Sequence, residues 1–170
     1  AFDKLDIFTE EPQDGYCAIH GLIRNKRVVR YFPTKYLELN PIFSKYKVLV
    51  PEANGSGAIG EVLSTPLIGK PLIGFTGSYI AIGQFTSIEN ANACMKYIKT
   101  KFARTLLGTL KVTQHNPSET WANVPLQDFT VSSDIDWSKS IAEIDQQLYA
   151  KYGLSAAEIN FIETTIKPMR

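Results

Sequence analysis

The sequence has only two cysteines and two histidines among its 170 residues, and these small numbers exclude several classes of protein. Cys17 and Cys94 are too few and too far apart for a disulfide scaffold or a zinc knuckle. Neither His20 nor His115 has a cysteine or histidine partner at the spacing of a metal site. We therefore expect no metal ion, and a chain that folds in a reducing cytoplasm.

Long apolar runs are also missing. No stretch approaches the roughly 20 apolar residues that span a bilayer, so we expect no membrane partner. The first eleven residues lack the basic and apolar regions of a signal peptide. The composition, 44% hydrophobic and 21% charged, is typical of a globular protein. We expect a single domain over residues 1–170 that includes a helical subregion at 140–167.

Catalytic patterns are absent as well. No Asp-x-Lys or Glu-x-Lys, the end of a paired-acid nuclease motif, occurs in the chain. The adenine-methylating tetrad needs two prolines, but "NPIF" (40–43) and "NPSE" (116–119) carry one each. Residues 55–60 match GxGxxG, yet Pro66 follows too soon for a helix to bind a cofactor phosphate. The chain itself is expected to hold no catalytic residue and no cofactor.

The pattern of strands and helices predicts an α+β fold. Two β-rich runs flank the polar turn 24–26, and further strands are expected at 45–51 and 77–85. An apolar stripe at three- and four-residue steps predicts one long amphipathic helix over 88–112, beginning at a capping box formed by Thr86 and Glu89. Two more capping boxes, Ser140 with Glu143 and Ser155 with Glu158, begin two short C-terminal helices. We expect a small mixed or antiparallel sheet packed against the long helix, with a short extended segment around Val124.

The net charge of +1 hides a strong asymmetry along the chain. Residues 1–14 hold five acids and one lysine, and residues 119–170 hold eight acids and four bases, so residues 15–118 are strongly basic. The predicted helix has no acid opposite its apolar stripe after Glu89, although exposed helices usually mix both signs. A polyanionic partner would explain this basic face. The alternative is that the face folds back beside the acidic termini.

Five segments together resemble a known family. They are "KYKVLVPEANGSG" (45–57), "YIAIGQF" (79–85), "NACMKYIKTKFARTLLGTLKVTQ" (92–114), "VPLQDF" (124–129) and "IDQQLYAKYGLSAAEINFIETTIKPM" (144–169). They look like the C-terminal target-recognition (specificity) domain of bacterial type II restriction–modification proteins that carry an adenine-specific DNA methyltransferase. The resemblance covers about residues 44–169, and its most specific parts are "TKF", "VPLQDF" and "LYAKYGL".

The resemblance implies a domain that selects the DNA site while an upstream methyltransferase core flips and methylates an adenine. S-adenosylmethionine is then expected in that core, and the present chain is expected to be a fragment of the larger protein. The expected partners are double-stranded DNA and the methyltransferase domain. Two other functions stay open: part of a restriction endonuclease catalytic unit, and a scaffold that binds another subunit through the acidic C-terminal helices.

The expected DNA contacts fall into two groups. Base recognition is assigned to the hairpin and the Gly-rich loop, because arginine can bind guanine and asparagine can bind adenine. Phosphate contacts are assigned to the basic helix face. The predicted DNA-binding residues are Arg24, Asn25, Lys26, Arg27, Arg30, Lys47, Asn54, Ser56, Lys96, Lys99, Lys101, Arg104, Lys111, Gln114 and His115.

Overall fold

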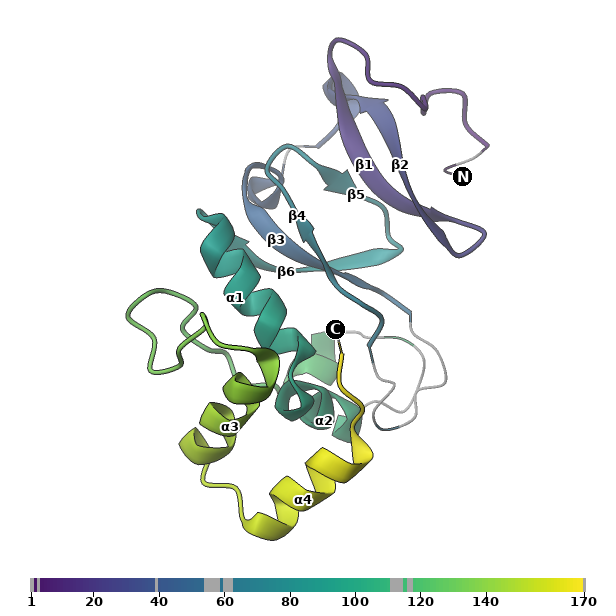
Figure 1. Cartoon of the computed structure of the whole chain (residues 1–170). Helices are drawn as coiled ribbons and strands as arrows, with labels where there is room; N and C mark the ends of the chain where they lie inside the picture. Colours follow the sequence, from purple (N-terminus) through teal and green to yellow (C-terminus); the bar gives the residue numbers. More distant parts are fainter. Residues whose placement is uncertain are drawn as a thin grey trace.

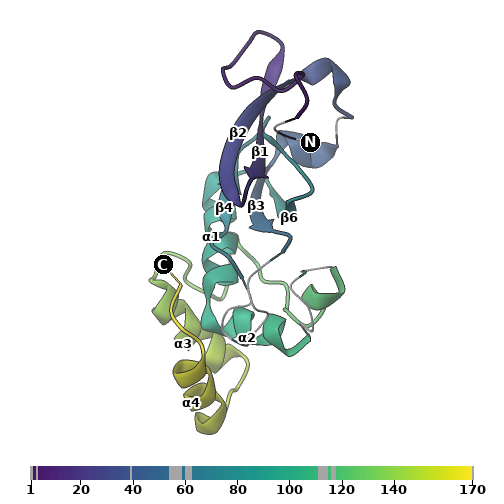
Figure 2. The same cartoon turned by 90° about the vertical axis from the view of Figure 1, so that its right-hand side faces the viewer.

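The computed structural model describes residues 2, 4–38, 40–53, 59, 63–110, 115 and 118–169. Figure 1 shows an elongated molecule, with two small sheets at one end and helices at the other. Strand β6 leads directly into helix α1, which runs from the sheets toward the helical end (Figure 2).

The first sheet is a hairpin with one additional short strand. Strands β1 (Tyr16–Ile23) and β2 (Lys26–Pro33) pair antiparallel, and β5 (Gly74–Phe75) pairs parallel to β1. Alternate residues of β1 are buried, as expected of a strand with one covered face. Cys17 and Ile19 pack on this covered face against Phe2 of the N-terminal segment.

The second sheet has the order β4–β3–β6 and is antiparallel throughout. Its central strand β3 (Tyr46–Pro51) is buried from the second residue onward, whereas β4 (Leu67–Gly69) and β6 (Tyr79–Phe85) lie at the edges. The short 3-10 helices η1 (Thr34–Tyr36) and η2 (Pro41–Ser44) connect the two sheets. The predicted strands at 45–51 and 77–85 are therefore confirmed to within two residues.

The predicted helix over 88–112 is two helices, α1 (Ile88–Lys99) and α2 (Lys101–Leu110). Thr100 separates them with an extended ψ of 151°. Its buried hydroxyl donates to the Tyr97 carbonyl at 2.6 Å and accepts from the Ala103 N–H at 3.1 Å, so it ends one helix and caps the next. The apolar stripe continues across the break, which explains why periodicity alone predicts a single helix.

The C-terminal half contains η3 (Ser118–Trp121), α3 (Ile141–Lys151) and α4 (Ala156–Thr165). The capping boxes at Ser140 and Ser155 are confirmed. The box at Thr86 is wrong, because the N-cap of α1 is Ser87, which accepts from the Asn90 N–H at 3.2 Å. The segment around Val124 forms no strand.

The α+β class is confirmed, with the helices gathered at one end of the sheets. Helices α3 and α4 bury Ile144, Leu148 and Ile162 against Tyr97 and Phe102 of α1 and α2. A second cluster joins Val48 and Val50 of β3 to α1 and α2. Across the described ranges, no helix combines the length and the apolar character needed to cross a membrane.

Candidate nucleic-acid interface

The tip of the β1–β2 hairpin is a two-residue turn made by Arg24 and Asn25. Ile23 pairs with Lys26 across the hairpin, and the two turn residues have φ values of 47° and 62°. Positive φ at both positions characterises the type I′ turn, whose twist matches that of the strands. Arg24, Asn25, Lys26 and Arg27 are all exposed, so four consecutive polar side chains occupy the tip. Arg24 and Lys26 also line a hollow that contains acidic Asp6 and Glu10.

Two arginines of the hairpin bond to other parts of the chain. The Arg27 guanidinium donates to the Thr65 carbonyl, just after the Gly-rich segment. Arg30 forms an ion pair with Glu10 at 2.6 Å, so its charge is partly neutralised within the chain. Arg27 therefore ties the hairpin to the chain at Thr65.

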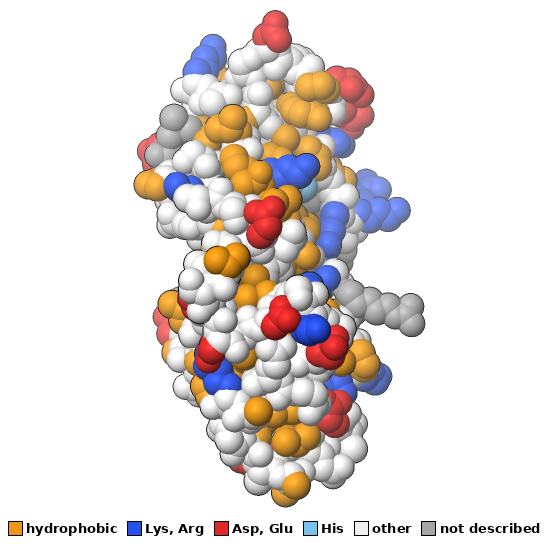
Figure 3. Space-filling model, turned by 60° about the vertical axis from the view of Figure 1, so that its left-hand side comes forward, with side chains coloured by type: hydrophobic (Ala, Val, Ile, Leu, Met, Phe, Trp, Pro, Cys, Tyr) orange, Lys and Arg blue, Asp and Glu red, His pale blue; other side chains and the backbone are white. Residues whose placement is uncertain are grey.

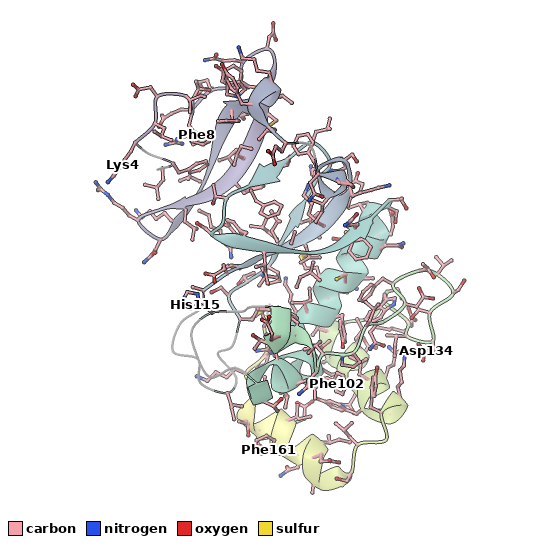
Figure 4. The ribbon with its side chains drawn as sticks, turned by 180° about the vertical axis from the view of Figure 1, so that it is seen from behind. Lys4, Phe8, Phe102, His115, Asp134 and Phe161 are labelled. Carbon is pink, nitrogen blue, oxygen red and sulfur yellow. The ribbon has the colours of Figure 1, made fainter. Side chains whose placement is uncertain are left out.

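His115 contacts the end of the described segment 40–53. Ala53 and His115 form an isolated antiparallel bridge, and His115 Nδ1 lies 2.7 Å from Glu52 Oε1. The hairpin tip and His115 lie on the same side of the molecule in Figure 4. Four other predicted DNA-binding residues lie outside the described residues: Asn54, Ser56, Lys111 and Gln114.

Lys47 does not face a ligand. Its side chain is fully buried, and its ammonium donates to four backbone carbonyls at 3.1 to 3.5 Å. They belong to Ile42, Phe43, Lys45 and Lys70. Burial lowers the pKa of Lys47, and the carbonyls partly replace the lost hydration. Lys47 thus ties η2 to the end of β4, and its assignment to DNA contact is wrong.

Lys96 and Lys101, two bases of the predicted helix face, bind the C-terminal part of the chain. Lys96 Nζ donates to the carbonyls of Trp137, Ser138 and Lys139 at 2.7, 3.2 and 2.8 Å. Lys101 pairs with Glu163 of α4 at 2.5 Å, and only 13% of its side chain is exposed. These lysines join α1 and α2 to the segments that carry the acidic excess.

Arg104 is buried, with 2% of its surface exposed. Its guanidinium donates to the carbonyls of Lys99 and Thr100 at 3.2 and 3.3 Å, and to that of Lys167 at 2.6 Å. Burial lowers its pKa, while the nearby Asp145 opposes that effect. The Arg104 side chain thus links the helix break at Thr100 to the C-terminal segment at Lys167.

The predicted solvent-exposed basic face is therefore wrong for most of its described members. Lys99 differs, because its ammonium makes no hydrogen bond or ion pair within the described ranges. Figure 3 shows red and blue side chains interspersed over the helical half, whereas blue side chains gather at mid-height on one edge. The alternative interpretation of the charge asymmetry holds for the helices: acidic C-terminal segments fold back onto the basic ones.

Sequence analysis missed Asp145, the residue at the centre of this arrangement. Its carboxylate, on α3, accepts from the backbone N–H groups of Lys101 and Phe102 at 3.0 and 2.9 Å. It thereby caps α2 from another helix, and no spacing rule within one segment reveals such a contact. The nearby Tyr149 hydroxyl donates to Glu163 at 3.0 Å, which extends the polar cluster across α3 and α4.

Among the described residues, no three or more histidine, cysteine, aspartate or glutamate side chains are grouped so that they could hold a metal ion. His20 lies in the hairpin, where burial, together with the charges of Lys47 and Arg27, lowers its pKa. None of the family models, curated proteins or solved structures compared with this chain matches it.

Proposed function

We propose that this chain is a double-stranded DNA-binding module, and that it selects the target site for an adenine-N6 methyltransferase core of a restriction–modification protein. The observation that carries the proposal is the hairpin tip, where Arg24, Asn25, Lys26 and Arg27 are consecutive and exposed. The resemblance of five sequence segments to target-recognition domains supports the same function.

A two-stranded antiparallel ribbon is one of the elements that fit the major groove of B-DNA, which is roughly 12 Å wide. The tight turn makes the tip narrow, and its side chains are of the kinds that recognise bases. Arginine donates two hydrogen bonds to guanine, and asparagine both donates to and accepts from adenine. Lys26 and Arg27 add positive charge for the phosphates on either side. Arg27 also bonds to the Thr65 carbonyl, which fixes the base of the tip on the chain.

The revised interface differs from the one expected from sequence. Lys47 and Arg104 are buried, and Lys101 is paired, so their internal bonds give no support to phosphate contacts. The proposal therefore rests on the hairpin, with Lys99 as a secondary contact, because His115 is already bonded to Glu52. Methyl transfer is assigned to a separate core, because the sequence contains no catalytic pattern of its own.

The test uses fluorescence anisotropy of the chain with a 20-base-pair duplex of mixed sequence, across a series of salt concentrations. Arg24→Gln/Lys26→Gln removes two charges at the tip, and Lys139→Gln/Lys167→Gln removes two exposed charges at the helical end. Each lost phosphate contact lowers the log–log salt slope by about 0.9, so the tip variant should bind more weakly with a flatter slope. The control variant should bind like the unaltered chain. Equal effects of the two variants would contradict the proposal.

Asn25→Gly tests base recognition separately. Glycine accepts the positive φ of the turn, so the hairpin keeps its shape while the amide is lost. Selection from a library of random duplexes should enrich a defined site with the unaltered chain. The variant should lose discrimination at one position of that site, by about 1–3 kcal/mol. An unchanged site preference would mean that Asn25 reads no base.

A further inference from the structure

The segment 4–14, which holds four acids and one lysine, is bound to the hairpin that carries the proposed DNA contacts. The Thr9 N–H donates to the Tyr31 carbonyl at 3.0 Å, and the Tyr31 N–H donates to the Thr9 carbonyl at 2.9 Å. Phe8 packs on Phe32 of β2, with 5.1 Å between the ring centroids, and lies beside the hairpin in Figure 4. None of these contacts uses a charged side chain, so they hold this acidic segment in place when its acids are neutralised.

Two acids of the segment lie on one face of the hairpin. Successive side chains of a strand point to opposite faces, so Lys26, Val28 and Arg30 share one face of β2, and Arg27 lies on the other. On the face of Lys26 and Arg30, residues of the acidic segment and of the hairpin line a hollow of about 590 Å³. Its charged lining residues are Asp6, Glu10, Arg24, Lys26 and Arg30. Two acids therefore lie among three of the bases that are expected to contact DNA.

Arg30 already donates to a carboxylate at the place where a phosphate would bind it. The ion pair with Glu10 measures 2.6 Å, and the side chains of Arg30 and Glu10 are 22% and 76% exposed. An ion pair with so exposed an acid contributes little to stability, so it is easily exchanged. A DNA phosphate accepts hydrogen bonds from a guanidinium as a carboxylate does, and can replace it. Asp6 adds a second negative charge to the hollow that Arg24 and Lys26 line.

We propose that the acidic segment is an autoinhibitory element, which competes with DNA phosphates for the bases of the hairpin and above all for Arg30. A phosphate contacts Arg30 only when Glu10 releases it. The segment therefore lowers the affinity for duplexes of every sequence, and it leaves base recognition by the hairpin tip unchanged. This inference rests on the proposed DNA binding by the hairpin.

Fluorescence anisotropy of the full chain with the mixed 20-base-pair duplex, across the same salt series, tests the competition. Asp6→Asn/Glu10→Gln neutralises the two acids of the hollow, and Glu89→Gln/Glu119→Gln removes two exposed acids outside it. The first variant should bind at least about threefold more tightly than the unaltered chain, with a log–log salt slope steeper by about 0.9 for the contact that Arg30 gains. The control changes the net charge equally and should gain less than about twofold, with an unchanged slope.

A double-mutant cycle assigns the gain to Arg30. Glu10→Gln alone should tighten binding, whereas Glu10→Gln/Arg30→Gln should bind no more tightly than Arg30→Gln. A gain from Glu10→Gln that persists in the absence of Arg30 would overturn the competition, because Glu10 would then act only through the general charge of the chain.

The inference and the proposed function fail in different ways. If the unaltered chain binds the duplex and Asp6→Asn/Glu10→Gln binds it no more tightly than the control variant does, the inference is overturned and the proposed function stands. If neither the unaltered chain nor Asp6→Asn/Glu10→Gln binds, both are overturned. Binding by Asp6→Asn/Glu10→Gln alone would support both, because the acids would then block the hairpin completely.

Discussion

Asp145 should make the stability of the chain fall as the pH rises from 4 to 7. The residue is 2% exposed, and its carboxylate accepts from two backbone N–H groups at the start of α2. Burial raises its pKa from 3.8 to about 6. The charge of Glu163 adds to this effect, and the two N–H groups and Arg104 oppose it without cancelling it.

The magnitude follows from the difference between the folded and unfolded states. The folded chain binds the proton of Asp145 more tightly, so the associated stabilisation is complete below about pH 3.8 and is lost as the pH rises through 6. The two pKa values differ by about two pH units, each worth about 1.4 kcal/mol, which gives about 3 kcal/mol. This is a large part of the 5–15 kcal/mol that is typical of the total stability of a domain.

The comparison is between the unaltered chain and Asp145→Asn, which keeps the shape and one acceptor oxygen but does not titrate. Urea unfolding, followed by tryptophan fluorescence between pH 3.5 and 8, gives the free energy of unfolding of each. The unaltered chain should lose about 3 kcal/mol relative to the variant over this range. Other carboxylates titrate in both proteins, so their contributions largely cancel in the difference.

Asp134→Asn is the matched control. Its carboxylate is 60% exposed and pairs with Lys151 at 2.8 Å, so its removal should change the stability by less than about 1 kcal/mol. The reasoning is refuted if the difference between the unaltered chain and Asp145→Asn stays constant with pH. If the unaltered chain instead gains stability relative to Asp145→Asn as the pH rises, the two N–H groups stabilise the charge more than burial penalises it.

Two further predictions concern the helix bases and the absence of catalytic chemistry. Arg104→Gln should lower the free energy of unfolding by about 3–5 kcal/mol, because it leaves buried carbonyls without their donor. Lys99→Gln should change the free energy of unfolding by less than about 0.5 kcal/mol. Urea unfolding of both variants measures these changes, and equal effects would contradict the internal role of Arg104. The chain alone should neither methylate nor cut DNA and should not bind S-adenosylmethionine; calorimetry that shows micromolar binding, or turnover abolished by a point change in this chain, would refute this.

Local patterns in the sequence were sufficient for most of the secondary structure. The hairpin follows from two β-rich runs around a turn that carries Asn25, a residue that tolerates positive φ. The capping boxes at Ser140 and Ser155 follow from spacing alone, because both partners lie within one helical turn. Each of these features depends on residues that are near neighbours in the chain.

The partners of the basic helix residues could not be predicted in this way. The apolar stripe correctly places Ile98 and Phe102 in the core, but it says nothing of what covers the opposite side. Lys101 reaches Glu163 and Arg104 reaches the Lys167 carbonyl, both more than 60 positions along the chain. The acidic excess at each end of the sequence is compatible with two outcomes, pairing of the basic face within the chain or binding of a polyanionic partner. The sequence alone does not distinguish them.

The sequence by itself thus determines most of the strands, helices and caps, because these depend on propensity and on contacts within a few residues. The cap that Asp145 supplies to α2 is an exception, because it comes from another helix. Whether a charged side chain is free for a ligand depends on which segments fold against it. Lys47 and Arg104 are buried by segments distant in sequence, while the hairpin tip stays exposed because no other segment covers it within the described ranges. Tertiary packing therefore decides whether a charged side chain bonds within the protein or stays available for a ligand. The reason is that burial removes the hydration of the charge, and partners from distant segments must compensate for that loss.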